Sequence, residues 1–177
     1  LSALKIAQRI CSKFIPPNAK NKICFVQADL SYGLGMFRPQ SFHGVTAGLS
    51  ISYADHWDSL RGEWDDNSYI GLLRDIYFLL IEGGELIFST NVPNPDFFLI
   101  AKKSWKKIFL SWKLPLGIAV SLIMLLQARW LKASANVGRF HYLRSEQIVR
   151  ILREIGFKDI RYKLTYEGQA WVFAATK

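Results

Sequence analysis

Hydrophobic and polar positions follow two different periods along the chain, and the change between them is clearest over residues 72–90. The apolar residues of the first part recur at helical spacing: Leu73, Ile76, Tyr77 and Leu80. After Gly83 and Gly84, residues 86–88 form a continuous apolar run, which is typical of a parallel strand covered on both faces. The pattern predicts a helix that ends in a left-handed conformation at one of these glycines, followed by a buried strand.

Shorter patterns predict that helices and strands alternate along the rest of the chain. An amphipathic helix is expected before Pro16, and apolar runs predict strands over residues 23–28 and 45–50. A polar, acidic loop over residues 55–67 then leads into the helix described above. Because strands and helices alternate, the sequence predicts a single α/β domain over residues 1–177.

The end of the chain predicts a helix followed by two antiparallel strands. Ser145 is expected to cap a helix whose apolar stripe reaches Ile155, and Gly156 is expected to end that helix. Apolar residues alternate over 160–166, and a second apolar run at 170–175 follows a turn. A mostly parallel sheet that finishes in an antiparallel hairpin is therefore expected.

The composition of the chain bears on its binding partners and on its cellular location. The formal charge of +9 favours an anionic partner, without choosing among nucleic acid, acidic lipid and a phosphorylated substrate. Cys11 and Cys24 stand apart, so neither a disulfide framework nor a zinc site is expected, and both are predicted to be buried thiols. The chain shows no secretory signal pattern, and a cytoplasmic location is expected.

Four blocks, in their order and spacing, resemble a class I S-adenosylmethionine-dependent methyltransferase of the small-molecule kind often called type 11. Residues 25–29 resemble that family's third strand with its terminal acid, and residues 41–49 resemble its fourth strand. Residues 80–90 resemble its Gly-Gly motif and fifth strand, and residues 155–160 the entry to its final hairpin. The resemblance covers nearly the whole chain and implies a Rossmann-like sheet and S-adenosylmethionine as the cofactor.

The family's first strand, its glycine-rich loop and the acid that ends its second strand have no counterpart in this sequence. His43 also stands where the family usually has an aspartate. The glycine-rich loop lets the backbone approach the cofactor, and the missing acid would bind the ribose hydroxyls. We therefore expect a domain that is N-terminally incomplete because the chain is truncated, and weak cofactor binding by the chain alone.

The resemblance also implies where the cofactor would lie. Asp29 and the backbone of Leu30 are expected to contact adenine, although an acid at the end of a strand also caps loops. Gly48, Leu49 and Ser50 are expected to pass beside the methionine portion of the cofactor, and plain packing of the sheet explains these three residues equally well.

The candidates for the methyl acceptor's side follow the fourth and fifth strands or belong to the segment after them. Those for binding the acceptor are Tyr53, Asn91, Trp105 and Tyr142. His56 and His141 are candidates for a general base, since imidazole titrates near neutrality, with a structural or solvent-exposed role as the alternative. No metal is expected.

Residues 92–143 differ in character and are expected to form a helical insertion. Lysines alternate there with Trp105 and Trp112, and residues 114–126 are almost entirely apolar but shorter than the roughly 20 residues that span a bilayer. Three roles stay open for the insertion: a lid over the acceptor, a lid that also contacts anionic membrane through residues 102–126, and a packing face for another subunit or upstream chain. No nucleic-acid partner is expected.

The sequence thus predicts a methyltransferase that acts on a small, hydrophobic acceptor. The alternative is a non-catalytic remnant, or a membrane-associated binding module, with the same fold. A serine hydrolase is disfavoured because residues 48–52 lack the last glycine of the nucleophile elbow. A nicotinamide enzyme is disfavoured because residues 33–35 lack the third glycine of the dinucleotide motif. Methylation of oxygen, nitrogen or carbon stays open.

Overall fold

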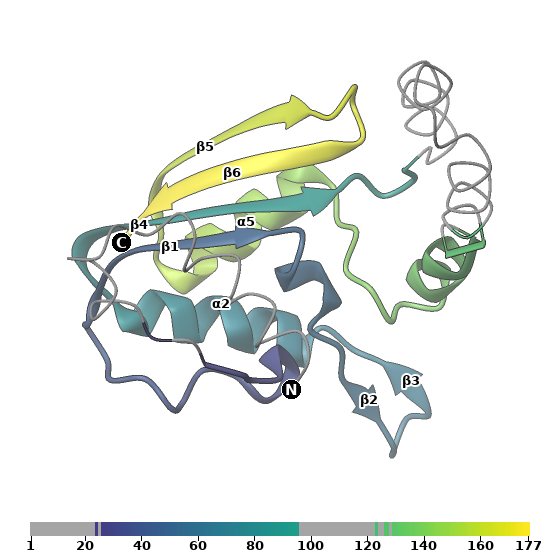
Figure 1. The fold of residues 1–177 in the computed structure, drawn as a ribbon, viewed down its shortest axis with the longest axis horizontal. Helices are drawn as coiled ribbons and strands as arrows, with labels where there is room; N and C mark the ends of the chain where they lie inside the picture. The colour runs from purple at the N-terminus through teal and green to yellow at the C-terminus, as the bar shows by residue number, and fades with distance from the viewer. Residues whose placement is uncertain (1–23, 25, 96–122, 124–125, 128) are drawn as a thin grey trace, which may run out of the picture.

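The computed structural model describes residues 24, 26–95, 123, 126–127 and 129–177. Within these residues, four strands form one sheet in the order β1-β4-β6-β5 (Figure 1). The strands are β1 (Phe42–Gly48), β4 (Leu80–Asn91), β5 (Lys158–Thr165) and β6 (Ala170–Thr176). β1 and β4 are parallel, whereas β6 is antiparallel to both β4 and β5. The α/β class and the closing hairpin are therefore confirmed.

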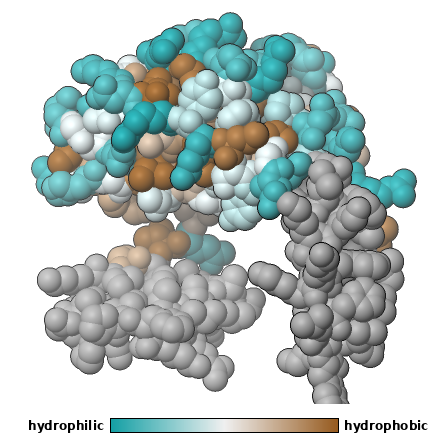
Figure 2. Space-filling view, turned by 90° about the horizontal axis from the view of Figure 1, so that it is seen from above, coloured by the Kyte–Doolittle hydropathy of each residue, from teal (hydrophilic) through white to brown (hydrophobic). Residues whose placement is uncertain are grey.

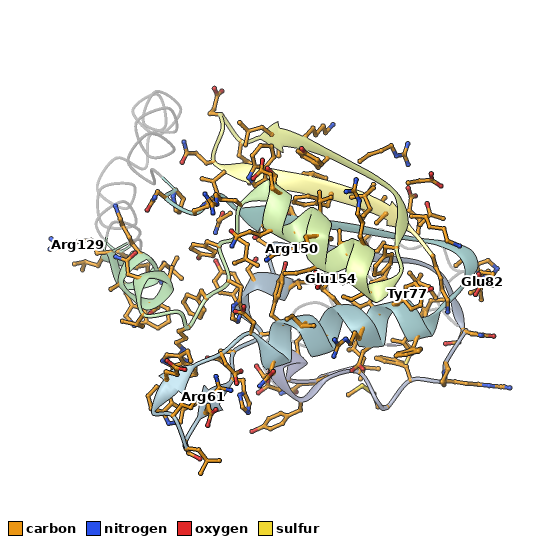
Figure 3. All side chains as sticks on the ribbon, turned by 180° about the vertical axis from the view of Figure 1, so that it is seen from behind. Arg61, Tyr77, Glu82, Arg129, Arg150 and Glu154 are labelled. Atoms are coloured by element: carbon orange, nitrogen blue, oxygen red, sulfur yellow. The ribbon has the colours of Figure 1, made fainter. Side chains whose placement is uncertain are left out.

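Two helices cover one face of the sheet, as the view from behind shows (Figure 3). They are α2 (Asn67–Leu79) and α5 (Ser145–Ile155). Short connecting elements complete the described part: η2 (Leu30–Tyr32), η3 (Ile51–Tyr53), and a small hairpin of β2 (Trp57–Asp58) and β3 (Glu63–Trp64).

The core lies between the two helices and the covered face of the sheet. Ladder partners share a face, so the register of Phe88 with Phe173 and of Phe173 with Tyr162 puts three aromatic rings in one row. The Phe88 and Phe173 rings are stacked with centroids 5.3 Å apart, and both side chains are buried. Leu73 of α2 and Leu152 of α5 belong to the same core cluster. The predicted helical and strand periods thus bury one common set of residues.

Hydrophobic side chains are also exposed on the strands. Figure 2, which looks at the molecule from the side of β5, shows brown hydrophobic side chains among teal hydrophilic ones. Ile87 on β4 is 38% exposed, and its ladder partner Ala174 lies beside Arg161 on the face opposite the core row. The described residues place no helix on that face.

The two glycines at 83 and 84 lie inside β4, so the prediction that one of them ends the helix is wrong. α2 ends at Leu79, and Leu80 is already extended, with φ −72° and ψ 140°. Gly83 does have a left-handed φ of 75°, but it lies where the register with β1 shifts, between the pairs Phe42–Leu80 and Gly44–Glu85. The glycine therefore forms a bulge in a long strand instead of a helix terminus.

The strand predicted over residues 23–28 is absent from its described residues, 24 and 26–28. A strand requires a neighbour for its backbone hydrogen bonds, and among the described strands β1 pairs only with β4. Cys24 is consequently exposed, which corrects the prediction that it is a buried thiol. Cys11, the helix expected before Pro16, and residues 96–122 of the predicted insertion lie outside the described residues.

Both ends of α5 follow from local sequence. Gly156 adopts a φ of 117°, and its N–H donates to the carbonyls of Leu152 and Arg153, which confirms the predicted helix end. The start is one residue earlier than predicted, because Arg144 is the cap and Ser145 is already helical. The Gln147 side chain accepts a hydrogen bond from the Arg144 N–H at 3.0 Å.

Candidate functional site

The carboxyl ends of β1 and β4 lie at the same edge of the sheet because these strands are parallel. After β1, Leu49 has a left-handed φ of 52°, and its N–H donates to Ser89 Oγ of β4 at 3.0 Å. A second link joins the buried hydroxyls of Ser52 and Thr90, 2.6 Å apart. These two hydrogen bonds fix η3 beside the end of β4, which is the edge where open α/β sheets bind ligands.

Three of the four residues predicted to bind the methyl acceptor come together at this edge. The Tyr142 hydroxyl donates to the Tyr53 hydroxyl at 3.0 Å, and the Asn91 amide donates to the same oxygen at 3.5 Å. Both lone pairs of the Tyr53 oxygen are then used, whereas no described residue accepts its proton. Within the described part of the chain, the Tyr53 hydroxyl therefore has its proton available for a ligand. The fourth residue, Trp105, lies outside the described residues.

Tyr142 is more deeply buried than Tyr53. Its side chain is buried, and burial, followed by the hydrogen bond to Tyr53, raises the pKa of its hydroxyl. Tyr142 therefore stays protonated at neutral pH and keeps donating to Tyr53. Its part in the site is to orient the Tyr53 hydroxyl.

Aromatic rings line the tyrosine pair. Phe140 packs edge-on against Tyr53 with centroids 4.9 Å apart, and Trp130 packs against Phe140 at 5.6 Å. Trp130 and Phe140 belong to the last part of the predicted insertion, residues 92–143, and Tyr53 belongs to η3. This side of the site is therefore apolar, with the Tyr53 hydroxyl as its polar group.

An arginine that the sequence analysis did not single out holds this segment in place. Arg139 Nε donates to Asp55 Oδ2 at 2.7 Å, and the guanidinium lies 4.9 Å from the centre of the Trp64 ring and 5.6 Å from that of Phe140. Such a contact combines an ion pair with cation–π attraction. A single arginine next to an aromatic residue carries no distinctive sequence signal, because its partners are far away in the chain.

His141 faces away from the tyrosine pair. Phe140 and Tyr142 pack on Tyr53, whereas the His141 ring packs on Tyr69 of α2, with centroids 5.1 Å apart. His141 Nδ1 lies 2.9 Å from Asp66 Oδ1, and Nε2 is buried without a hydrogen-bond partner among the described residues. Burial lowers the pKa of the imidazole, and the Asp66 carboxylate opposes part of this effect. The geometry gives His141 a place in the packing at the start of α2.

Lowering the pH is expected to destabilise the domain through His141. Its pKa is lower in the folded than in the unfolded state, so the unfolded state takes up the proton first as the pH falls. Stability is therefore present above the unfolded value of about 6.5 and is lost below it. Urea midpoints measured from about pH 7 to about pH 5 should fall in the natural chain and fall less in His141→Asn. Equal slopes in both proteins would contradict the prediction.

His56, the other candidate base, lies at the open end of the β2–β3 hairpin. Its Nδ1 is 2.8 Å from Asp65 Oδ1, and the Asp65 N–H donates to the His56 carbonyl. The side chain is about half exposed. His56 and His141 thus contact different carboxylates. Each of these contacts can hold its histidine in place as part of the structure.

The residues predicted to hold the cofactor lie before β1 and at its carboxyl end. Asp29 caps η2, and its carboxylate accepts a hydrogen bond from the Ser31 N–H at 3.0 Å. Leu30 and Ser50 line an apolar groove of about 260 Å³ that runs along β1. The loop after η2 is held on α2, because Asp75 accepts a hydrogen bond from the Leu34 N–H at 2.7 Å.

These residues fit part of the cofactor. An apolar groove suits the adenine ring, and a Cβ added at Gly48 would meet no atom within 4 Å, so space is open beside the strand end. The described residues contain no glycine-rich loop to hold the amino-acid portion. The residues present would therefore suit the adenine ring and leave open space beside the end of β1.

Comparisons with known proteins bear on the fold. No protein-family model matches the chain, and no curated protein matches it by sequence. A protein from Bordetella parapertussis, described as a possible exported protein, is similar in structure, with 20% identity and a TM-score of 0.57, over 99% of this chain and 50% of that one. The chain therefore spans about half the length of this neighbour.

Two further neighbours are S-adenosylmethionine-dependent methyltransferases. The one from Archaeoglobus fulgidus is 12% identical, with a TM-score of 0.49, over 89% of this chain and 69% of that one. The one from Thermotoga maritima, described as a possible histamine N-methyltransferase, is 15% identical, with a TM-score of 0.49, over 90% and 67% of the two chains.

The strand order and the closing hairpin agree with what the sequence resemblance implies. The chain thus has an α/β fold, and its likeness to a solved structure concerns the fold alone. Among the described residues, no helix combines the length and the apolar character that crossing a membrane requires.

Proposed function

We propose that this domain takes part in methyl transfer from S-adenosylmethionine to a small acceptor that binds at Tyr53, Asn91 and Tyr142. The observation that carries the proposal is the Tyr53 proton, which no described residue accepts, at the carboxyl edge of the sheet with aromatic rings around it. A hydrogen-bond donor in an apolar wall suits a mostly hydrophobic methyl acceptor that carries an oxygen or nitrogen lone pair. The cofactor supplies the activated methyl group, and the protein orients the acceptor and excludes water.

The cofactor would lie on the β1 side of this edge. The groove beside Leu30 and Ser50 would take the adenine ring, with the Asp29 carboxylate at its rim. The strand end at Gly48 and Leu49 would face the methionine portion. The link between Leu49 and Ser89 supports this assignment, because it fixes the cofactor's strand relative to the acceptor's strand.

A methyl-transfer assay at high protein and millimolar S-adenosylmethionine concentration tests the proposal. We expect slow methylation of apolar alcohols or amines and no methylation of strongly charged acceptors. The position of the label in the product, read by mass spectrometry, would show whether oxygen, nitrogen or carbon is the acceptor atom. Absence of product with every acceptor, together with absence of cofactor binding, would contradict the proposal.

A binding module without catalysis is the second candidate. It is favoured by one observation, namely that the described residues include no glycine-rich loop for the cofactor's amino-acid portion. Such a module would bind an apolar molecule at Tyr53 regardless of whether S-adenosylmethionine is present. A cytoplasmic location stays a prediction from the sequence.

A further inference from the structure

Asp55 lies between the cofactor side and the acceptor side of the proposed site. It follows Tyr53 of η3 by two residues and precedes β2 (Figure 1). The Asp55 side chain is 23% exposed, and Ala54, which separates it from Tyr53, is buried. The Asp55 carboxylate is therefore held close to the backbone that carries the Tyr53 hydroxyl.

The two oxygens of the Asp55 carboxylate bind two different parts of the chain. Oδ1 accepts a hydrogen bond from the Ser31 hydroxyl at 3.2 Å, and the Asp55 N–H donates to the same hydroxyl oxygen at 3.2 Å. Oδ2 accepts a hydrogen bond from Arg139 Nε at 2.7 Å. Ser31 is 24 positions from Asp55 in the chain, and Arg139 is 84 positions away. The carboxylate therefore joins η2 to the segment that carries Phe140 and Tyr142.

Ser31 belongs to the side proposed for the cofactor. Its neighbour Leu30 lines the apolar groove along β1, whereas Ser31 is not part of the groove wall. The backbone of Ser31 is held at two further points, because its N–H donates to the Asp29 carboxylate at 3.0 Å and its carbonyl accepts from the Ser68 hydroxyl of α2 at 2.9 Å. The Ser31 hydroxyl thus contacts Asp55 from outside the groove.

Arg139 belongs to the side proposed for the acceptor. Its guanidinium lies 4.9 Å from the centre of the Trp64 ring and 5.6 Å from that of Phe140, and Phe140 packs on Tyr53. A hydrogen bond between charged partners is roughly twice as strong as one between neutral groups. A displacement of the Asp55 carboxylate would therefore move the guanidinium together with the aromatic rings that it contacts.

We infer that Asp55 is a positioning residue that couples the cofactor groove to the aromatic wall of the acceptor. A cofactor in the groove beside Leu30 restrains η2, the Ser31 hydroxyl then restrains the carboxylate, and the carboxylate restrains Arg139. Coupling between two binding sites is reciprocal, so an acceptor that holds Phe140 in place also favours the bound cofactor. The inference rests on the proposed function, because it takes this groove as the cofactor's place.

An NMR titration of the full chain with S-adenosylhomocysteine tests the inference, with the side-chain Nε–H of Arg139 as the reporter. Arg139 does not line the groove, so a response of this group is transmitted through the protein. In the natural chain the Arg139 signal should shift together with the Leu30 amide, with the same half-saturation concentration. In Ser31→Ala the Leu30 amide should still shift, whereas the Arg139 signal should lose its response.

Two control variants separate a transmitted effect from a general loss of structure. Ser31→Thr keeps a hydroxyl and should restore the response of Arg139. Ser41→Ala removes a hydroxyl that donates to the Arg38 carbonyl just before β1, and this variant should behave like the natural chain. Without ligand, the Arg139 Nε–H should exchange with water about fivefold faster in Ser31→Ala than in Ser41→Ala, since one hydrogen bond contributes about that factor.

Two results would overturn the coupling and leave the proposed function in place. One is an Arg139 signal that stays unchanged while the Leu30 amide shifts. The other is an Arg139 Nε–H that exchanges equally fast in Ser31→Ala and Ser41→Ala. Absence of shifts at both Leu30 and Gly48 is a different result, because it would overturn the proposed cofactor site and the coupling together.

Discussion

Replacing Phe173 with alanine is expected to lower the free energy of unfolding by about 3–5 kcal/mol. The Phe173 side chain is fully buried, and its ring lies between Phe88, at 5.3 Å, and Tyr162, at 5.4 Å, on the two neighbouring strands. Removing the ring leaves a cavity at the centre of the sheet's covered face, where both helices pack. The free energy of unfolding of a single domain is about 5–15 kcal/mol in total, so this loss is a large part of the stability.

Urea denaturation measures the effect of Phe173→Ala, and Tyr166→Ala is its control. Tyr166 follows β5 and is 64% exposed, so its removal should change the unfolding free energy by no more than about 0.5 kcal/mol. If the two variants were equally stable, the core would not lie where the ladder of β4, β6 and β5 places it.

Replacing Tyr53 with phenylalanine is expected to lower kcat/KM for the acceptor by about 10- to 100-fold. The variant removes the proton proposed to bind the acceptor and leaves the Tyr142 hydroxyl and the Asn91 amide without their shared oxygen. Tyr142→Phe should cost less than about tenfold, because the Tyr53 proton remains and only its orientation is lost.

The order of these two effects is the informative result, and the methyl-transfer assay described above measures it. Tyr162→Phe is the control, since Tyr162 lies on β5 and packs on Trp171 and Phe173, away from the tyrosine pair. A larger loss in Tyr142→Phe than in Tyr53→Phe would contradict the assignment of Tyr53 as the donor to the acceptor.

The fold was predictable where the hydrophobic period is long. The residues of α2, α5 and the closing hairpin repeat their period over several turns or pairs, and the structure confirms these elements. The run at 23–28 has equal apolar character but no described neighbour to pair with, and a strand cannot form alone. Similarly, Gly83 is left-handed as predicted, but pairing with β1 extends β4 back through it to Leu80.

The candidate site was predictable only in part. Tyr53 and Asn91 could be placed because each lies at or after the end of a strand that a known topology brings to one edge. Tyr142 could be named but its partner could not, since the Tyr53–Tyr142 contact joins residues 89 positions apart. The Arg139–Asp55 pair, 84 positions apart, was missed for the same reason. Local sequence shows which elements form, whereas side-chain pairs across loops depend on the packing of the whole domain.

A titration of the ¹⁵N-labelled chain with S-adenosylhomocysteine, followed by NMR, tests the central claim most directly, because it detects weak as well as tight binding. We predict concentration-dependent shifts at the amides of Asp29, Leu30 and Gly48–Ser50, and unchanged amides in the hairpin of β5 and β6. The Asp29→Asn variant, which keeps a side chain able to cap η2, should bind more weakly at the same amides. Shifts confined to other surfaces, or no shifts up to millimolar concentrations, would contradict the assignment of this sheet edge to the cofactor.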